Sequence, residues 1–133
     1  MKVNAMMLRS LMICVASFCL LGSQQAANAA GPLQGNWILG CSTISGGAAP
    51  FTNSVFAFNQ QSAGFQAQNS PAPGQPLCTM LGTQFGTLLF GTEVCGIPRS
   101  SSGIFIGTVT NGVSMKMFWL DSQGVYLIQG SKF

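Results

Sequence analysis

Residues 103–132 carry the pattern that most restricts the fold of this chain. Apolar and polar side chains alternate on both sides of the dipeptide Asn111-Gly112. Such a pair between alternating runs favours a type I′ hairpin, because both turn positions need a positive φ. A second turn signal begins at Asp121. The segment therefore predicts a three-stranded antiparallel meander, with strands at 103–110, 113–120 and 125–132.

The chain before this meander consists of short β-type runs separated by Gly- and Pro-containing turns. Residues 69–76 hold three prolines and no apolar periodicity, which indicates a loop. The remaining expected elements are 36–44, 54–59, 64–68, 77–83 (a short strand or one helical turn) and 84–92. These runs predict an all-β fold of about six to eight strands, either a small antiparallel up-and-down barrel or a sandwich. A barrel is favoured because its closure removes neutral edges that would pair with other chains.

The N-terminal segment has the three parts of a secretory signal peptide. Lys2 and Arg9 give residues 1–9 a positive charge, residues 11–22 are apolar, and Ala27-Asn28-Ala29 fits a cleavage site. We therefore expect a cleaved signal peptide over 1–29 and one small β domain over 30–133. The expected location is extracytoplasmic, either periplasmic or secreted. The apolar run is shorter than the roughly 20 residues of a membrane-spanning helix, so no transmembrane segment is expected after cleavage.

Charged side chains are almost absent. Residues 10–92 contain none, and the chain has no histidine. Most enzymes need such groups to move protons or stabilise charge, so we expect neither catalytic residues nor a cofactor. Asp121 is expected to cap its own turn, Glu93 to be solvated, and Arg99 to face solvent from a loop. No basic patch supports nucleic-acid binding.

The domain expected after cleavage keeps three cysteines, and an exported chain favours disulfides. Cys78–Cys95 is the preferred bridge because the segment between these residues has the composition of a local turn and strand; Cys41–Cys95 is the alternative. Under the first pairing Cys41 is left as a buried thiol or as one that links two chains into a dimer. Three widely spaced cysteines without histidine do not match a zinc site, so no metal is expected.

Leu33-Gln34-Gly35-Asn36-Trp37 resembles the G-x-W opening of the calycin superfamily, which includes lipocalins and avidins. This resemblance implies an up-and-down barrel in which the Trp37 side chain closes one end. In that superfamily the barrel interior holds a small ligand. The resemblance assigns no particular ligand to this chain.

Two functions follow as hypotheses. The first is an exported, non-catalytic binding protein for an apolar small molecule or a partner protein such as a hydrolase. Its expected ligand contacts are Trp37, Met115, Met117 and Trp119. Plain core packing is the favoured alternative for such side chains, since a small domain needs most of its apolar residues for its own core. The alternative is a structural or surface-assembly protein of the cell envelope, suggested by the uncharged composition and the odd cysteine. A filled interior would move the binding hypothesis to the outer surface.

Overall fold

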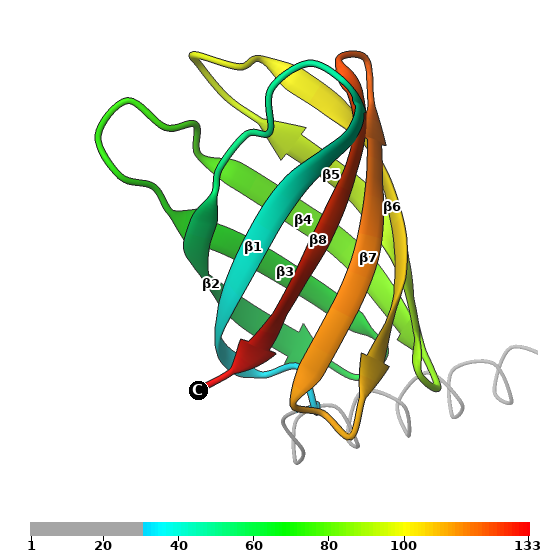
Figure 1. Cartoon of the computed structure of the whole chain (residues 1–133). Helices are drawn as coiled ribbons and strands as arrows, with labels where there is room; N and C mark the ends of the chain where they lie inside the picture. Colours follow the sequence, from blue (N-terminus) through cyan, green and yellow to red (C-terminus); the bar gives the residue numbers. More distant parts are fainter. Residues whose placement is uncertain (1–30) are drawn as a thin grey trace, which may run out of the picture.

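A computed structural model describes residues 31–133, which form eight antiparallel strands (Figure 1). The predicted signal peptide lies outside the described residues. Each strand pairs with its neighbours in the sequence, and β1 pairs with β8, so the sheet closes into an up-and-down barrel. The strands are β1 Gly35–Gly46, β2 Asn53–Gln61, β3 Gly64–Ser70, β4 Cys78–Phe85, β5 Leu88–Cys95, β6 Ser101–Thr110, β7 Ser114–Asp121 and β8 Gly124–Lys132. The all-β prediction and its barrel form are confirmed.

The predicted C-terminal meander is present as β6, β7 and β8. Asn111 and Gly112 both have positive φ, 51° and 65°, as the hairpin prediction requires. The connection is one residue longer than predicted, because Thr110 pairs with Ser114 and leaves Val113 in the turn. Val113 is therefore 56 % exposed, although the alternation with Met115 and Met117 would place it on the buried face if the strand began there.

The segment between the proline-rich loop and the meander folds as a second hairpin. The ambiguous run at 77–83 is a strand, β4, and not a helical turn. Its end extends to Phe85, so the start of the strand predicted at 84–92 belongs to β4 instead of β5. Gly86 makes the reversal possible, because its φ of 62° is one that side-chain-bearing residues rarely adopt.

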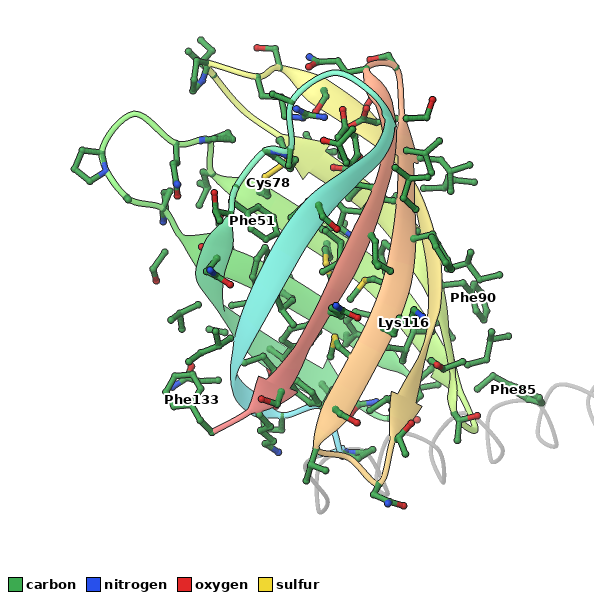
Figure 2. All side chains as sticks on the ribbon, in the orientation of Figure 1. Phe51, Cys78, Phe85, Phe90, Lys116 and Phe133 are labelled. Carbon is green, nitrogen blue, oxygen red and sulfur yellow. A yellow bond between two sulfur atoms is a disulfide. The ribbon has the colours of Figure 1, made fainter. Side chains whose placement is uncertain are left out.

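The barrel interior is packed with apolar side chains (Figure 2). Alternate residues of each strand point inward, as the two-residue period of a strand requires. Aromatic rings form a continuous series, with centroid separations of 5.7 Å for Phe58–Phe65 and 5.9 Å for Phe65–Phe105. The largest fully buried apolar side chains are Trp37, Trp119, Tyr126, Phe56, Phe105, Leu33, Leu39, Met80, Leu89, Met117 and Ile128.

Residues outside the strands close both ends of this core. Leu33, just before β1, is completely buried, and its backbone carbonyl accepts a 2.8 Å hydrogen bond from Trp37 Nε1. The Leu33 amide donates to Gln60 Oε1 at 2.9 Å. At the other end, Phe51 in the β1–β2 connection packs against Phe56 and Trp119 with centroid distances of 5.3 and 5.8 Å. Both ends are thereby sealed by apolar side chains.

Candidate binding surface

The four side chains predicted to contact a ligand all lie inside this packed core. Trp37, Met117 and Trp119 are completely buried, and Met115 is 4 % exposed. The Trp119 indole packs edge-on against Phe51, and its Nε1 donates to Met117 Sδ at 3.3 Å. These side chains form a large part of the apolar core, which is the role expected from the sequence as the alternative to ligand binding. Their role as ligand contacts stays a prediction.

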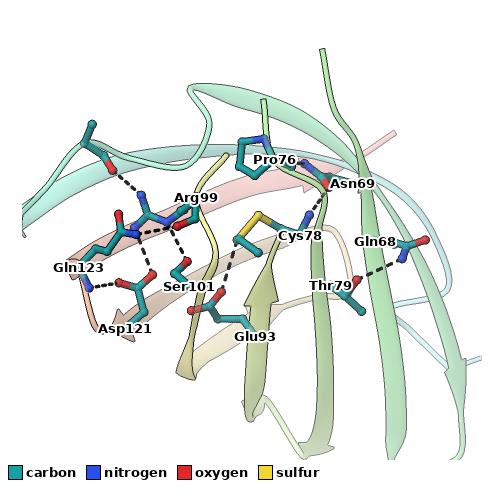
Figure 3. The surroundings of a disulfide bond; sticks show 12 residues. Gln68, Asn69, Pro76, Cys78, Thr79, Glu93, Arg99, Ser101, Asp121 and Gln123 are labelled. Carbon is teal, nitrogen blue, oxygen red and sulfur yellow. Dashed lines mark hydrogen bonds and ion pairs between the residues drawn. A yellow bond between two sulfur atoms is a disulfide. The ribbon is translucent and has the colours of Figure 1, made fainter. Parts of the chain in front are cut away.

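The preferred disulfide is present. Cys78 and Cys95 are bonded across the paired strands β4 and β5, where they face each other in register (Figure 3). Cys41 is free and buried. Burial raises the pKa of the Cys41 thiol to about 12, so the thiolate that would attack another sulfur is scarce at neutral pH.

Arg99 is the centre of a polar cluster at the end of the barrel that carries the disulfide (Figure 3). Its guanidinium donates to Asp121 Oδ2 at 3.1 Å, to the Ala48 carbonyl at 2.7 Å and to Ser101 Oγ at 3.0 Å. It also lies over the Tyr126 ring, 4.7 Å from the centroid. Its side chain is only 7 % exposed. The predicted solvent-facing arginine is thus wrong: Arg99 ties three chain segments together and has little capacity left for a ligand.

Asp121 has the turn role that the sequence predicted. Its Oδ1 accepts hydrogen bonds from the backbone amides of Gln123 at 2.8 Å and Gly124 at 3.1 Å. Its other oxygen carries the ion pair with Arg99. The carboxylate therefore holds the β7–β8 turn against the loop after β5, a second role that the sequence did not indicate.

Glu93 is completely buried, and the prediction of a solvated side chain is wrong. The alternation of β5 turns it inward, between Leu89 and Cys95 on the same face. Its Oε1 has no hydrogen-bond partner. Its Oε2 lies 3.5 Å from Cys95 Sγ, but a disulfide sulfur carries no hydrogen to donate. Burial, assisted by the Asp121 charge, raises the pKa of Glu93 to about 7.

Two shallow hollows lie on the surface. One, of about 280 Å³, lies among the loops at the Arg99 end and is lined by Ala49, Gln75, Pro98 and Gln123 among others. The second, of about 440 Å³, lies over β6, β7 and β8 and includes Lys116 and Gln129. Both are open to solvent, and neither is lined by a carboxylate.

The outer surface of the barrel differs from strand to strand. Strands β4 to β7 present nine large apolar side chains to solvent, with exposed fractions between 38 % and 78 %. Phe85 and Phe90 point away from the barrel on this side (Figure 2). We call this set the apolar face. It consists of Leu81, Phe85, Leu88, Phe90, Val94, Ile104, Ile106, Phe118 and Leu120.

Strand register brings members of the apolar face together in cross-strand rows. Phe90 pairs with Ile106, which pairs with Phe118. One step further along the strands, Ile104 pairs with Leu120. Neighbouring strands are about 4.8 Å apart, so these side chains touch across the sheet and form a continuous surface.

Strands β2 and β3 are more polar, whereas β1 beside them exposes Ile38 and Ile44. Strands β2 and β3 present Asn59, Gln61, Gln66 and Gln68 outward, and all four are exposed. We call these four residues the polar face. Outward-facing β-strands of soluble proteins normally have this character. The contrast between the two faces shows that the apolar face is a local feature and not the general state of this surface.

The sequence carries a signal for the apolar face. In β5, β6 and β7 apolar residues occupy both parities of the alternation, as at Phe105 inside and Ile104 and Ile106 outside. In the same way Phe118 and Leu120 lie outside on β7, next to Trp119 inside. The Gly positions obscured the pattern, because they break the alternation on the inner side.

Comparisons with known proteins identify the fold and no family. No family model matches the chain, and no curated protein matches it. Among solved structures it is similar to a redesigned β-barrel, with a TM-score of 0.58 and 15 % identity over 82 % of this chain and 95 % of that one. This likeness supports a small β-barrel; membership of the calycin superfamily stays a prediction. Within residues 31–133 no helix is long and apolar enough to cross a membrane.

Proposed function

We propose that this protein is an exported, non-catalytic binding protein that docks a partner protein on the outside of its barrel, through the apolar face. The observation that carries this proposal is a set of nine exposed apolar side chains on four adjacent strands. They expose on the order of 800 Å² in total, taking roughly 150–250 Å² for a whole large side chain. The largest apolar patch of a typical soluble monomer is about 300–600 Å². A surface of this size is characteristic of an interaction site.

The packed interior favours the outer surface over a small-molecule pocket. Trp37, Met117 and Trp119 occupy the space that a ligand would need. Leu33 and Phe51 close the two ends. An apolar small molecule would have to displace several of these side chains, at a cost of several kcal/mol by analogy with disrupted cores. The binding hypothesis therefore moves to the outside of the barrel.

A non-catalytic role agrees with the state of the ionisable groups. The chain has two carboxylates and no histidine. Asp121 is held by Arg99 and by its own turn, and Glu93 is enclosed by the core. Acid–base catalysis needs such a group within reach of a substrate, and neither carboxylate is open to one.

Export rests on the N-terminal pattern. If the signal peptide is removed after Ala29, the protein isolated from cells that produce it will begin at Ala30. Mass spectrometry of the intact chain measures this directly. An N-terminus that retains the apolar run at 11–22 would contradict cleavage and would leave the chain with an apolar anchor.

Photo-crosslinking in the producing cell tests the docking surface. Benzoylphenylalanine is placed at Ile106, in the middle of the apolar face, and in a matched variant at Gln66 on the polar face. Both positions face outward from strands, so the two probes have similar access to solvent. Irradiation should give a discrete adduct of higher mass from position 106 and little or none from position 66.

The two arms together decide the proposal. An adduct confined to position 106 supports docking on the apolar face. Equal adducts from both positions would indicate random collision, and no adduct from either would leave the apolar face without a partner; both outcomes contradict the proposal. In the chain cleaved after Ala29, Cys41 should be the one thiol that reacts with a thiol reagent under denaturing conditions, and it should be protected under native conditions because it is buried; the same result in both variants shows that they have folded alike.

A further inference from the structure

The central row of the apolar face has the same side chains on both sides of β6. Ile106 lies on β6, and its outward neighbours in register are Phe90 on β5 and Phe118 on β7. These three side chains are 40–49 % exposed. Over these three strands the row reads Phe–Ile–Phe in either direction, and beyond them it continues to Thr83 on β4 and Leu127 on β8. The three-strand part of the row is self-complementary about a twofold axis parallel to β6.

From this symmetry we propose that the partner is a second copy of the chain, and that two barrels pack side by side about an axis along β6. This inference rests on the proposed function, because it names the occupant of the apolar face. Under this axis Ile106 meets Ile106 of the second copy. Phe90 meets Phe118 of the second copy, and the same contact is made again on the other side.

The area of the apolar face matches what a dimer of this kind needs. A stable interface of standard size buries about 800 Å² on each partner. The nine side chains expose an area on that order, and Thr92, Ser102 and Thr108 lie among them. Because two barrels are convex, β5, β6 and β7 form the centre of the contact. Leu81 and Phe85 on β4 then lie at its rim.

The charge distribution also favours a second copy. Along their length, strands β4 to β7 turn one charged side chain outward, Lys116, which lies one row away from the Ile106 row. Partners of different sequence are commonly guided to each other by complementary charge, and the apolar face offers almost none. Under the proposed axis Lys116 lies across from Leu88 of the second copy, because Leu88, Thr108 and Lys116 form one row. The two Lys116 side chains are then two strands apart, roughly 10 Å, and do not face each other directly.

A lipid surface is a poorer match to the same residues. Proteins that lie on membranes use Trp and Tyr at the interface and Lys or Arg towards anionic headgroups. Here Trp37, Trp119 and Tyr126 are all buried inside the barrel. Lys116, beside the apolar face, is the one cation that strands β4 to β7 turn outward. Binding to vesicles is therefore one of the outcomes that would contradict the proposal.

The first experiment measures association of the full chain, produced with its own N-terminal segment. Sedimentation equilibrium should give twice the mass of the single chain at micromolar concentration. Ile106→Glu places two carboxylates at the axis and should weaken the dimer about 100-fold, since unpaired buried charge is costly. Gln66→Glu adds the same charge to the polar face and should leave the association unchanged.

The second experiment fixes the axis and does not depend on the folding of the glutamate variant. A short bismaleimide should link Ile106→Cys into a dimer and should not link Gln66→Cys. An equal mixture of Phe90→Cys and Phe118→Cys should crosslink faster than either alone, because like positions are offset by two strands, roughly 10 Å. In the chain cleaved after Ala29 the remaining cysteines are buried Cys41 and bridged Cys78 and Cys95, which give little background.

The outcomes separate this inference from the proposed function. A monomer in sedimentation, with no crosslink at Ile106→Cys, overturns the dimer. If position 106 then still yields a photo-adduct with a different protein in the cell, docking on the apolar face stands and only the second copy is wrong. Association with uncharged phosphatidylcholine vesicles that Ile106→Glu abolishes would assign the face to lipid and also overturn the dimer.

Discussion

Replacing Trp119 by alanine should lower the free energy of unfolding by about 3–5 kcal/mol, the cost of removing a large aromatic side chain from a packed core. Trp119 is completely buried and contacts Phe51 and Phe56, with ring centroids 5.8 and 6.5 Å away. The cavity cannot close easily, because the surrounding strands belong to a closed barrel. Urea unfolding followed by circular dichroism measures the change.

The neighbouring residue on the same strand is the matched control. Phe118 faces outward and is 40 % exposed, so Phe118→Ala should cost no more than about 1 kcal/mol in the monomer, the usual range for surface positions. In a dimer its effect should grow with protein concentration, whereas the loss from Trp119→Ala should not. Similar, concentration-independent losses from both variants would contradict the division into a filled interior and a docking surface.

Replacing Glu93 by glutamine should stabilise the protein at pH 8 by on the order of 2–3 kcal/mol and leave it nearly unchanged at pH 4. The pKa of this carboxyl is raised from 4.5 to about 7 by burial. The folded state therefore holds the proton more tightly than the unfolded state. The contribution of protonated Glu93 to the free energy of unfolding is complete below pH 4.5 and is lost as the pH rises through about 7. Glutamine keeps the shape and removes the charge.

The composition makes this pH dependence unusually easy to assign. The chain has no histidine, and Asp121 is its only other side-chain carboxylate. Melting temperatures of the wild type and of Glu93→Gln, measured from pH 4 to pH 8, should converge in acid and diverge above pH 7. Gln66→Glu, which adds an exposed carboxylate, should follow the wild type. A wild-type curve that is as flat as that of Glu93→Gln would show that folding does not raise the pKa of this carboxyl.

The sequence predicted the elements of the fold well because their signals are local. Asn111-Gly112 specifies a hairpin from its own backbone preferences, and Asp121 specifies a turn by bonding to its neighbours. The same is true of the bridge between Cys78 and Cys95, which lie in one hairpin. Only the need to protect neutral strand edges favours a closed barrel over a sandwich. The pairing of β1 with β8 joins distant residues, and no local pattern specifies it.

The polar cluster and the apolar face could not be predicted in this way, because they depend on which side of a strand faces the core. The residue type of Glu93 predicts an exposed side chain, whereas the alternation of β5 turns that side chain inward. Arg99 was assigned to a loop surface, but Asp121 reaches it from a turn 22 residues later. Ile104 and Ile106 look like core residues until the barrel shows that Phe105 fills the inside.

The pairing of β1 with β8 also has a consequence for biosynthesis. Seven of the eight strand pairings join neighbours in the sequence and can form as soon as both strands exist. The eighth needs β8, which is the last strand to be synthesised, so the β1 edge stays unpaired until the chain is complete. Residues 35–46 contain neither the charged side chains nor the proline that usually protect such an edge. We therefore expect the incomplete chain, rather than the finished barrel, to be the form that most needs a chaperone.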